Sequence, residues 1–361
     1  MEEPKTLVRR RTQPSSANGE RRRERRGTGR VRITDVAKVA GVAPITVSRA
    51  LNAPDSLAAE TLQRVREAID RIGYVPNMLA GGLASSRSHL IAAVVPTIAS
   101  PVFQETWEAL TDNFANAGYH VTFGQTGYGG AREEELLDAI VARRPDGIVL
   151  TGIMRSPAGR RRLLGAGIPV VETWDLTPTP IDMLIGFSHE NIGAAVAEYL
   201  RAKGRGRIAV ITAADDRAMR RAKGLADAAA RLATASTLAG ELPMFVAPAP
   251  GTLGSGRKGL ADLIDRYPAI DAVFCSSDML ALGAVIEAQA RGISVPERIA
   301  VVGYGDLNFA AATVPPLTTV SVDGSAIGRL AARCIIDRAQ GRSVAEPVVD
   351  VGFSIVERAS A

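Results

Sequence analysis

The chain of 361 residues is poor in the residue types on which metal, disulfide and redox proteins depend. It has two cysteines, three histidines and an aromatic content of 4%. Cys275 and Cys334 have neither metal-binding nor redox spacing, and the histidines lie far apart, so neither a metal site nor a disulfide framework is expected. No run of about 18 apolar residues lacks a charge, and the first thirty residues are rich in arginine where a secretory signal would be apolar. We therefore expect a cytoplasmic protein without metal, cofactor or membrane span.

Positive charge is concentrated at the amino terminus. The chain carries a net +5, yet residues 1–30 have ten Lys and Arg against four Asp and Glu, so this segment carries +6 and the remainder −1. Because the run Arg21–Arg26 offers no apolar face, we expect a disordered tail. Two interpretations of the tail stay open: an arm that contacts DNA phosphates, or a solvated extension.

Residues 33–52, ITDVAKVAGVAPITVSRALN, form a helix-turn-helix pattern. Thr34 is suited to cap a short helix, and Gly41 follows that helix where a left-handed residue would turn the chain. Pro44 stands where the next helix would begin, a position that tolerates a residue without an N–H. Ile45 to Arg49 then include the outward-facing side chains, which could reach a DNA groove.

A third helix is expected from about Ala58 to Ile72, where apolar residues recur at intervals of three and four. It would complete a three-helix core of residues 31–75. The pattern alone is also compatible with a helical hairpin that has no role in DNA binding.

Beyond Leu90, strands and helices alternate, which predicts parallel sheets in an α/β fold. Too many strands are expected for one such sheet, so two lobes facing a cleft are predicted. The expected strands are 90–95, 119–124, 147–151, 168–172, 183–187, 207–212, 271–275 and 299–304, and the expected helices include 104–117, 132–143, 190–203, 218–233, 257–266 and 278–291.

The helix-turn-helix string, followed by GYVPN at 73–77, resembles the headpiece and hinge of the lactose-repressor (LacI/GalR) family. The resemblance implies an all-α helix-turn-helix headpiece, a hinge helix over 76–89, and binding to operator DNA. It implies a recognition helix in the major groove and a hinge leucine in the minor groove. The DNA-binding residues that it suggests are Thr34, Pro44, Ile45, Thr46, Ser48, Arg49, Asn52, Asn77, Ala80 and Leu83.

Two departures from the family pattern concern DNA recognition. Ala43 replaces a Ser or Thr cap, and Pro44 with Ile45 replaces more polar readers, so few direct hydrogen bonds to bases are expected. Gly81 and Gly82 lie inside the hinge, where each costs ~1 kcal/mol of helix stability relative to alanine. We expect the hinge to be helical only on DNA.

The remainder of the chain resembles the periplasmic-binding-protein-like core of the same family, through strings such as GFSHENIGAAVAEYL, SSDMLALGA and VVGYGD. The resemblance implies an α/β two-lobed core over 90–361. Its first lobe would comprise 90–188 and 318–345, and its second 189–317 and 346–358. Three crossovers between the lobes would act as a hinge.

A small-molecule effector is expected in the cleft between the lobes. The positions that would face it are Phe103, Tyr128, Thr151, Trp174, Phe187, Arg221, Ser277 and Asp278. Arg221 matches the family's ligand-binding arginine, although RRAK could be a solvated basic face. Trp174 could stack on a carbon chain or pack in the core, and Asp278 could cap the helix that it begins.

The chemistry of the effector is suggested by a missing carboxylate. Sugar-binding members commonly have Asp after the Tyr of VVGY, where this chain has Gly305. The absence of that charge favours an acidic ligand, with Arg217 and Arg220 near Arg221 as further positive charges. Strings such as GYGGAREEELLDAI and DGIVLTG resemble the gluconate-operon repressor subgroup, which implies a sugar acid such as gluconate.

The sequence thus predicts a sequence-specific repressor that acts as a homodimer and is not an enzyme. The dimer would form through Phe103, Trp107 and helix 104–117. Alternatives are a neutral sugar or nucleoside effector, or a different class altogether, a solute-binding or sugar-processing protein. The headpiece over 31–75 discriminates between the classes, because neither of the latter needs one.

Overall fold

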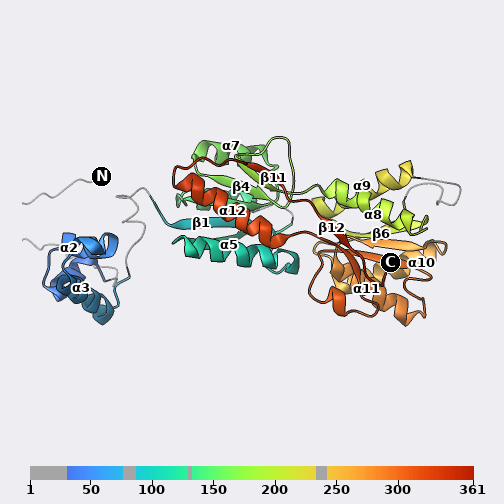
Figure 1. Ribbon diagram of the computed structural model, residues 1–361, viewed down its shortest axis with the longest axis horizontal. Coiled ribbons are helices and arrows are strands. Elements are labelled where there is room, and N and C mark those ends of the chain that lie inside the picture. The colour runs from blue at the N-terminus through green and yellow to red at the C-terminus, as the bar shows by residue number, and fades with distance from the viewer. Residues whose placement is uncertain (1–30, 76–86, 129–131, 233–241) are drawn as a thin grey trace, which may run out of the picture. The chain divides into compact units, whose positions relative to one another are not determined.

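A computed structural model describes residues 31–75, 87–128, 132–232 and 242–361. The basic tail and three predicted DNA contacts, Asn77, Ala80 and Leu83, lie outside these residues. The chain divides into two compact units, residues 1–81 and 82–361, which are described separately below (Figure 1).

The first unit contains the predicted helix-turn-helix. Helices α1 (Ile33–Ala40), α2 (Pro44–Asn52) and α3 (Ala59–Ile72) surround a small core, with a 3₁₀ turn, η1 (Pro54–Ser56), before α3. Gly41 has φ of 66°, as its capping position requires. The cap prediction for Thr34 was wrong. The N-cap is Arg32, whose N–H donates to Asp35 Oδ2 at 2.9 Å, so Thr34 is the second residue of α1 and has an exposed side chain.

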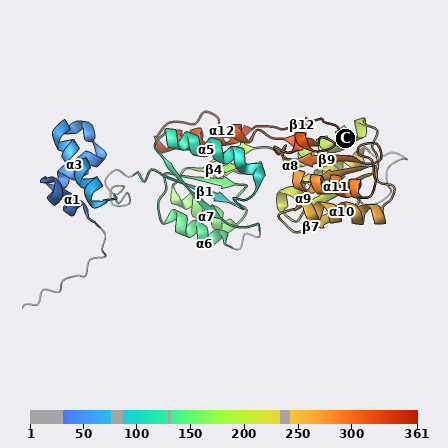
Figure 2. The same cartoon turned by 90° about the horizontal axis from the view of Figure 1, so that it is seen from below.

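The first lobe of the second unit is a parallel six-stranded sheet with the order β11-β5-β4-β3-β1-β2. Helices α5 and α12 cover one face and α6 and α7 the other (Figure 2). The strands are β1 (Leu90–Val95), β2 (His120–Gln125), β3 (Gly147–Thr151), β4 (Val170–Thr173), β5 (Met183–Gly186) and β11 (Val348–Asp350), and the helices are η2 (Pro101–Phe103), α5 (Gln104–Asn116), α6 (Glu133–Val141), α7 (Pro157–Ala166) and α12 (Gly324–Ala339).

The second lobe repeats this plan with the order β12-β10-β9-β8-β6-β7, in which only the β10–β12 pairing is antiparallel among the described strands. Helices α8 and α9 pack together, as do α10 and α11. The elements are α8 (His189–Ala202), β6 (Ile208–Ala213), α9 (Asp216–Arg231), β7 (Met244–Ala247), α10 (Leu253–Arg266), β8 (Ala272–Cys275), α11 (Asp278–Ala290), β9 (Ala300–Tyr304), η3 (Ala310–Ala312), β10 (Thr318–Ser321) and β12 (Ser354–Val356).

The chain passes between the lobes three times, and two of the predicted boundaries were wrong. Strand β10 pairs with β9 in the second lobe, whereas 318 was expected to begin the return to the first. Strand β11 pairs with β5 in the first lobe, although 346–358 was assigned to the second. The later crossovers therefore follow Ser321 and Asp350, because strand pairing, which local sequence does not reveal, fixes lobe membership.

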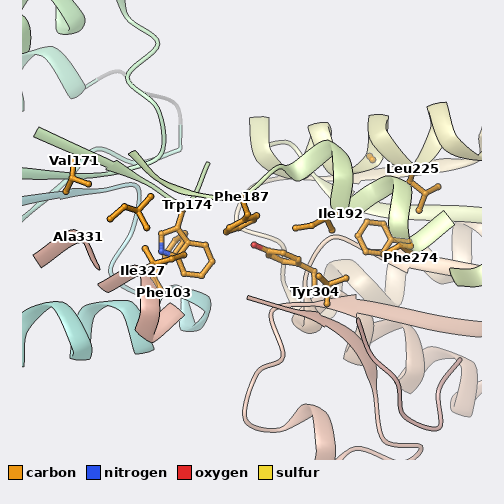
Figure 3. Packing of buried hydrophobic residues seen from close by; sticks show 14 of the residues in the cluster. Phe103, Val171, Trp174, Phe187, Ile192, Leu225, Phe274, Tyr304, Ile327 and Ala331 are labelled. Atoms are coloured by element: carbon orange, nitrogen blue, oxygen red, sulfur yellow. The ribbon is translucent and has the colours of Figure 1, made fainter. Parts of the chain in front are cut away.

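One apolar core runs through both lobes. Phe187, at the first crossover, lies between Trp174 and Phe103 on one side and Ile192 and Tyr304 on the other (Figure 3). Phe103 is 4% exposed and packs edge-on against Trp174, so it is used within the chain and is not available for the dimer contact expected of it.

Among the described residues, no helix is long and apolar enough to cross a membrane. In the same part of the chain, no three His, Cys, Asp or Glu side chains are grouped so that they could hold a metal ion.

Candidate DNA-binding and ligand-binding sites

Helix α2 presents a largely unpaired outer face. Its N-cap, Ala43, makes no side-chain capping bond, as the sequence predicted. Val47 is buried against the core, whereas Ile45 is 61% exposed and Arg49 also lies in solvent. Pro44 and Asn52 are exposed, while Thr46 and Ser48 are half-buried. Asn52 Nδ2 donates to Ser48 O at 3.0 Å, so this amide is partly engaged within its own helix.

A cavity of about 320 Å³ lies between the lobes of the second unit. We call it the interlobe cavity. The first lobe contributes Thr97, Ala99, Ser100, Pro101, Val102, Phe103, Tyr128 and Trp174, and the second His189, Ala213, Asp215, Arg217, Arg221, Pro250, Gly251, Ser276, Ser277, Met279, Tyr304 and Leu307. A side hollow of about 170 Å³ adjoins it and shares Tyr128, Asp215 and Arg217 with it. Thr151 and Gly152 line the side hollow.

Five of the eight predicted ligand-facing residues line the interlobe cavity: Phe103, Tyr128, Trp174, Arg221 and Ser277. Thr151 lines the side hollow, where its buried hydroxyl has no hydrogen-bond partner. Phe187 and Asp278 line neither. Phe187 is fully buried behind Trp174 and His189, in edge contact with both rings.

Asp278 points away from the interlobe cavity. Its carboxylate accepts from Thr319 Oγ1 at 2.6 Å and from Leu307 N at 2.8 Å, and the residue is fully buried. It is not the cap of α11 either, because Ser277 Oγ accepts from Leu280 N at 3.3 Å. Its role in the described structure is to tie α11 to β10 and to the segment after β9.

Burial raises the pKa of Asp278 to about 6, which yields a prediction about stability. The folded state holds this proton more tightly than the unfolded chain does. The stabilisation is therefore complete below the unfolded pKa near 4 and is lost as the pH rises through about 6. We expect Asp278→Asn to gain stability relative to the wild type between pH 4 and 7, by up to about 3 kcal/mol. Urea unfolding across this range measures the difference, and a difference independent of pH would contradict the prediction.

Arg221 is held at a close crossing of two helices. A Cβ on Gly193 of α8 would stand 2.0 Å from Arg221 O, and one on Gly224 of α9 would stand 2.2 Å from Glu190 O. Only glycine at both positions lets α8 and α9 approach this closely. The crossing fixes the backbone from which the Arg221 side chain enters the interlobe cavity.

The Arg221 guanidinium is a buried charge whose described hydrogen-bond and ring partners are all neutral. It donates from Nη1 to His189 Nδ1 and from Nη2 to Ser276 O, both at 3.0 Å, and it lies 3.9 Å from the Tyr304 ring centroid. Its Nε is buried without a partner. Burial lowers the pKa of Arg221, but a guanidinium keeps its proton in proteins. The site therefore supplies a free donor and a buried positive charge that no described carboxylate binds directly, with Asp215 and Asp175 acting on it only at longer range.

Arg217 and Arg220, which were expected to add positive charge near Arg221, differ in the contacts that their side chains make. Arg217, one turn earlier in α9, lies 5.2 Å from the Phe103 ring centroid, and its Nη1 is buried without a partner. Arg220 points elsewhere and donates to both oxygens of Asp175 and both of Glu190, at 2.6 to 2.8 Å. Only Arg217 therefore reinforces the positive potential of the interlobe cavity.

His189 was missed by the sequence analysis and lines the interlobe cavity. It is 1% exposed, and burial, followed by the nearby Arg221, holds its pKa well below the usual range. The ring is therefore neutral at pH 7. Because Nδ1 accepts from Arg221, the proton lies on Nε2, which donates to Trp174 O at 3.1 Å. The signal in the sequence that could have identified it was a single His shortly after the end of the predicted strand 183–187.

Gly305 has φ of 127° at the end of β9. Any L side chain would be strained in this conformation. The position that carries Asp in many sugar-binding relatives is thus built in this chain for a residue without a side chain.

Comparison with known proteins finds a matching family of domains for each of the two units. Residues 32–77 match the family described as bacterial regulatory proteins, lacI family, and residues 197–361 match a periplasmic binding protein-like domain. The chain is 39% identical over 336 residues to the HTH-type transcriptional regulator GntR of Pseudomonas aeruginosa, covering 93% of this chain and 97% of that protein.

Solved structures agree with this result. A LacI-family transcriptional regulator from Silicibacter pomeroyi superposes with a TM-score of 0.84 at 28% identity, covering 91% of this chain and 99% of that one. The Lac repressor dimer bound to operator superposes with a TM-score of 0.76 at 24% identity, covering 92% and 99%. Because the identity to the Lac repressor is only 24%, this second likeness shows a shared fold alone.

Proposed function

The chain belongs to the lacI family of bacterial regulatory proteins, and from this premise we propose that it is a repressor controlled by a sugar acid bound in the interlobe cavity. It is a DNA-binding transcriptional regulator with a helix-turn-helix headpiece. This headpiece distinguishes it from a solute-binding or sugar-processing protein. A regulator of transcription works where the genome is, which supports a cytoplasmic location.

The observation that carries the sugar-acid proposal is the pair Arg217 and Arg221. Both line the interlobe cavity, each has one buried nitrogen without a partner, and neither forms an ion pair with a described carboxylate. Leaving such donors unsatisfied is costly, and a ligand carboxylate would satisfy both charge and hydrogen bonding. The resemblance to gluconate-operon repressors names gluconate as the first compound to test.

The remaining polar groups suit the hydroxylated part of such a ligand. Tyr128, Asp215 and Arg217 stand where the interlobe cavity meets the side hollow. Asp215 Oδ1 caps α9 by accepting from Ala218 N at 3.0 Å, which leaves its second oxygen as a hydroxyl acceptor. Thr151 offers a hydroxyl beyond them. Trp174 and Phe103 supply an apolar wall for the carbon chain.

Control of DNA binding would follow from a change of the lobe angle. We propose that a homodimer binds a near-palindromic operator, with α2 of each headpiece in the major groove and the hinges bending the centre. The proposed contacts from α2 are Pro44, Ile45, Thr46, Ser48, Arg49 and Asn52. Ligand in the interlobe cavity would shift the amino-side lobes of the dimer relative to each other and pull the hinges out of register, so that repression is relieved.

Titration calorimetry with gluconate and glucose tests the ligand class, because glucose lacks the carboxylate; sorbitol, the open-chain polyol that differs from gluconate only in a hydroxymethyl group in place of the carboxylate, controls for the ring form of glucose. We expect gluconate to bind and glucose to bind at least ~100-fold more weakly, as loss of a charged hydrogen-bonded pair implies. Equal affinity for glucose would favour the neutral-sugar alternative. A nucleoside in the same titration covers the other alternative, and binding of only the nucleoside would refute the sugar-acid proposal.

A further inference from the structure

Four buried hydrogen bonds form a continuous chain from Arg221 into the first lobe. Arg221 Nη1 donates to His189 Nδ1 at 3.0 Å, and His189 Nε2 donates to Trp174 O at 3.1 Å. The Trp174 indole Nε1 donates to Thr106 Oγ1 at 3.2 Å, and that hydroxyl donates to Gly324 O at 2.8 Å. Each side chain in this chain of bonds is at most 5% exposed. We call it the relay.

The relay joins two of the three crossovers between the lobes. His189 begins α8 immediately after the first crossover, which leaves β5. Gly324 begins α12 immediately after the second crossover, which leaves β10. Any rotation of one lobe against the other must turn the chain at these crossovers. The relay therefore spans the place where the lobe angle is set.

Thr106 stands at a close crossing of α5 and α12. A Cβ on Gly328 would lie 2.5 Å from Thr106 O, so α5 and α12 are in backbone contact there. The Thr106 hydroxyl bridges the same two helices through Gly324 O. At such a closely packed crossing, α5 and α12 can shift only together.

Trp174 is the strained link of the relay. Its φ of 64° is in the left-handed region, which is costly for a bulky residue and persists only when the surroundings enforce it. The Trp174 N–H donates to Ile185 O at 3.1 Å, its carbonyl accepts from His189, and its indole is fixed by Phe103 and Thr106. Loss of either relay bond would relax this residue.

We propose that His189 and Thr106 are positioning residues that transmit the state of the Arg221 guanidinium to the second crossover. The inference rests on the proposed function in taking Arg221 as the ligand-binding group. An anion drawn to Arg221 Nε would turn the guanidinium and alter its bond to His189. The neutral His189 ring has one acceptor, Nδ1, and one donor, Nε2. A change in the bond that Nδ1 accepts from Arg221 therefore alters the bond that Nε2 donates to Trp174. Trp174 then passes the change through Thr106 to α12.

A double-mutant cycle on operator affinity, measured without effector, tests the relay. His189→Asn can keep the contact to Arg221 while losing the bond to Trp174, and Thr106→Val removes the hydroxyl while keeping the shape. We expect each to change operator affinity by about 3- to 10-fold, and the double variant to show only the larger single effect. The operator is obtained by selecting the tightest duplexes from a random pool with the wild-type chain.

Two controls separate the relay from general damage. Thr313→Val removes a hydroxyl that bonds only to Ala310 O and Pro315 O in its own loop of the second lobe, and should leave operator affinity within about twofold of the wild type. Thr106→Ser restores the hydroxyl and should restore wild-type affinity. Urea midpoints verify that every variant is folded.

Independent effects, whose fold-changes multiply in the double variant, would overturn the relay. So would a Thr106→Val variant that behaves like Thr313→Val. Because the cycle needs no effector, failure of gluconate to bind would refute the proposed function and leave the result on the relay standing.

Discussion

Arg221→Met is expected to abolish the response to gluconate and, because it removes the first bond of the relay, to change operator affinity without effector by no more than the about 3- to 10-fold expected of the relay variants. Methionine keeps much of the length of the side chain and removes its charge. Effector affinity should fall by on the order of 100-fold, because charge-assisted bonds to a carboxylate are lost in a buried site. Calorimetry measures the affinity, and fluorescence anisotropy with labelled operator measures DNA binding.

The free energy of unfolding of Arg221→Met should not fall in proportion to the loss of effector affinity. Arg221 has no carboxylate partner among the described residues, so its removal relieves the desolvation of a buried charge. Lys223→Met is the matched control, since Lys223 lies on the same helix, is exposed and pairs with Asp227. If Arg221→Met binds gluconate as tightly as the Lys223 variant does, the placement of the ligand is wrong.

Arg220→Met, at the preceding residue, is expected to lower the stability of the core, in contrast to Arg221→Met. Asp175 belongs to the first lobe, has a side chain that is 2% exposed, and is bound by Arg220 through both oxygens. Removing the arginine leaves a buried carboxylate whose described partners are the Leu176 N–H, at 2.8 Å, and the more distant charge of Arg155, at 3.6 Å. The core should lose about 3 kcal/mol of unfolding free energy. Urea denaturation followed by circular dichroism measures this loss.

The double variant Arg220→Met with Asp175→Asn provides the check on the cause. With both charges gone, no buried carboxylate is left unpaired, and much of the lost stability should return. An Arg220→Met variant that unfolds at the wild-type urea concentration would show that this interlobe ion pair contributes nothing measurable.

Much of the fold could be predicted because the sequence patterns are local. The glycine at 41 and the proline at 44 define the turn of the helix-turn-helix, and β3 was predicted with its correct bounds. The places of β10 and β11 could not be predicted, because lobe membership depends on which distant strand each one pairs with. Strand β7 was also missed, since three of its four residues are half-buried or exposed.

The candidate site was predicted unevenly for a related reason. Arg221, predicted from the family resemblance, and Trp174, predicted from its ability to stack on a carbon chain, both line the interlobe cavity. Asp278 was misplaced because residue spacing does not reveal that Thr319 and Leu307, far along the chain, hold its carboxylate. His189 escaped notice because its importance comes from two contacts across the crossover, with Arg221 and Trp174.

The central claim is that a sugar acid in the interlobe cavity controls operator binding, and reciprocal titration tests it most directly. Operator affinity is measured with and without saturating gluconate, and gluconate affinity with and without saturating operator. The account predicts that each ligand weakens the other by the same factor, about 5- to 150-fold, as thermodynamic linkage requires. Operator affinity that is unchanged at saturating gluconate would contradict it.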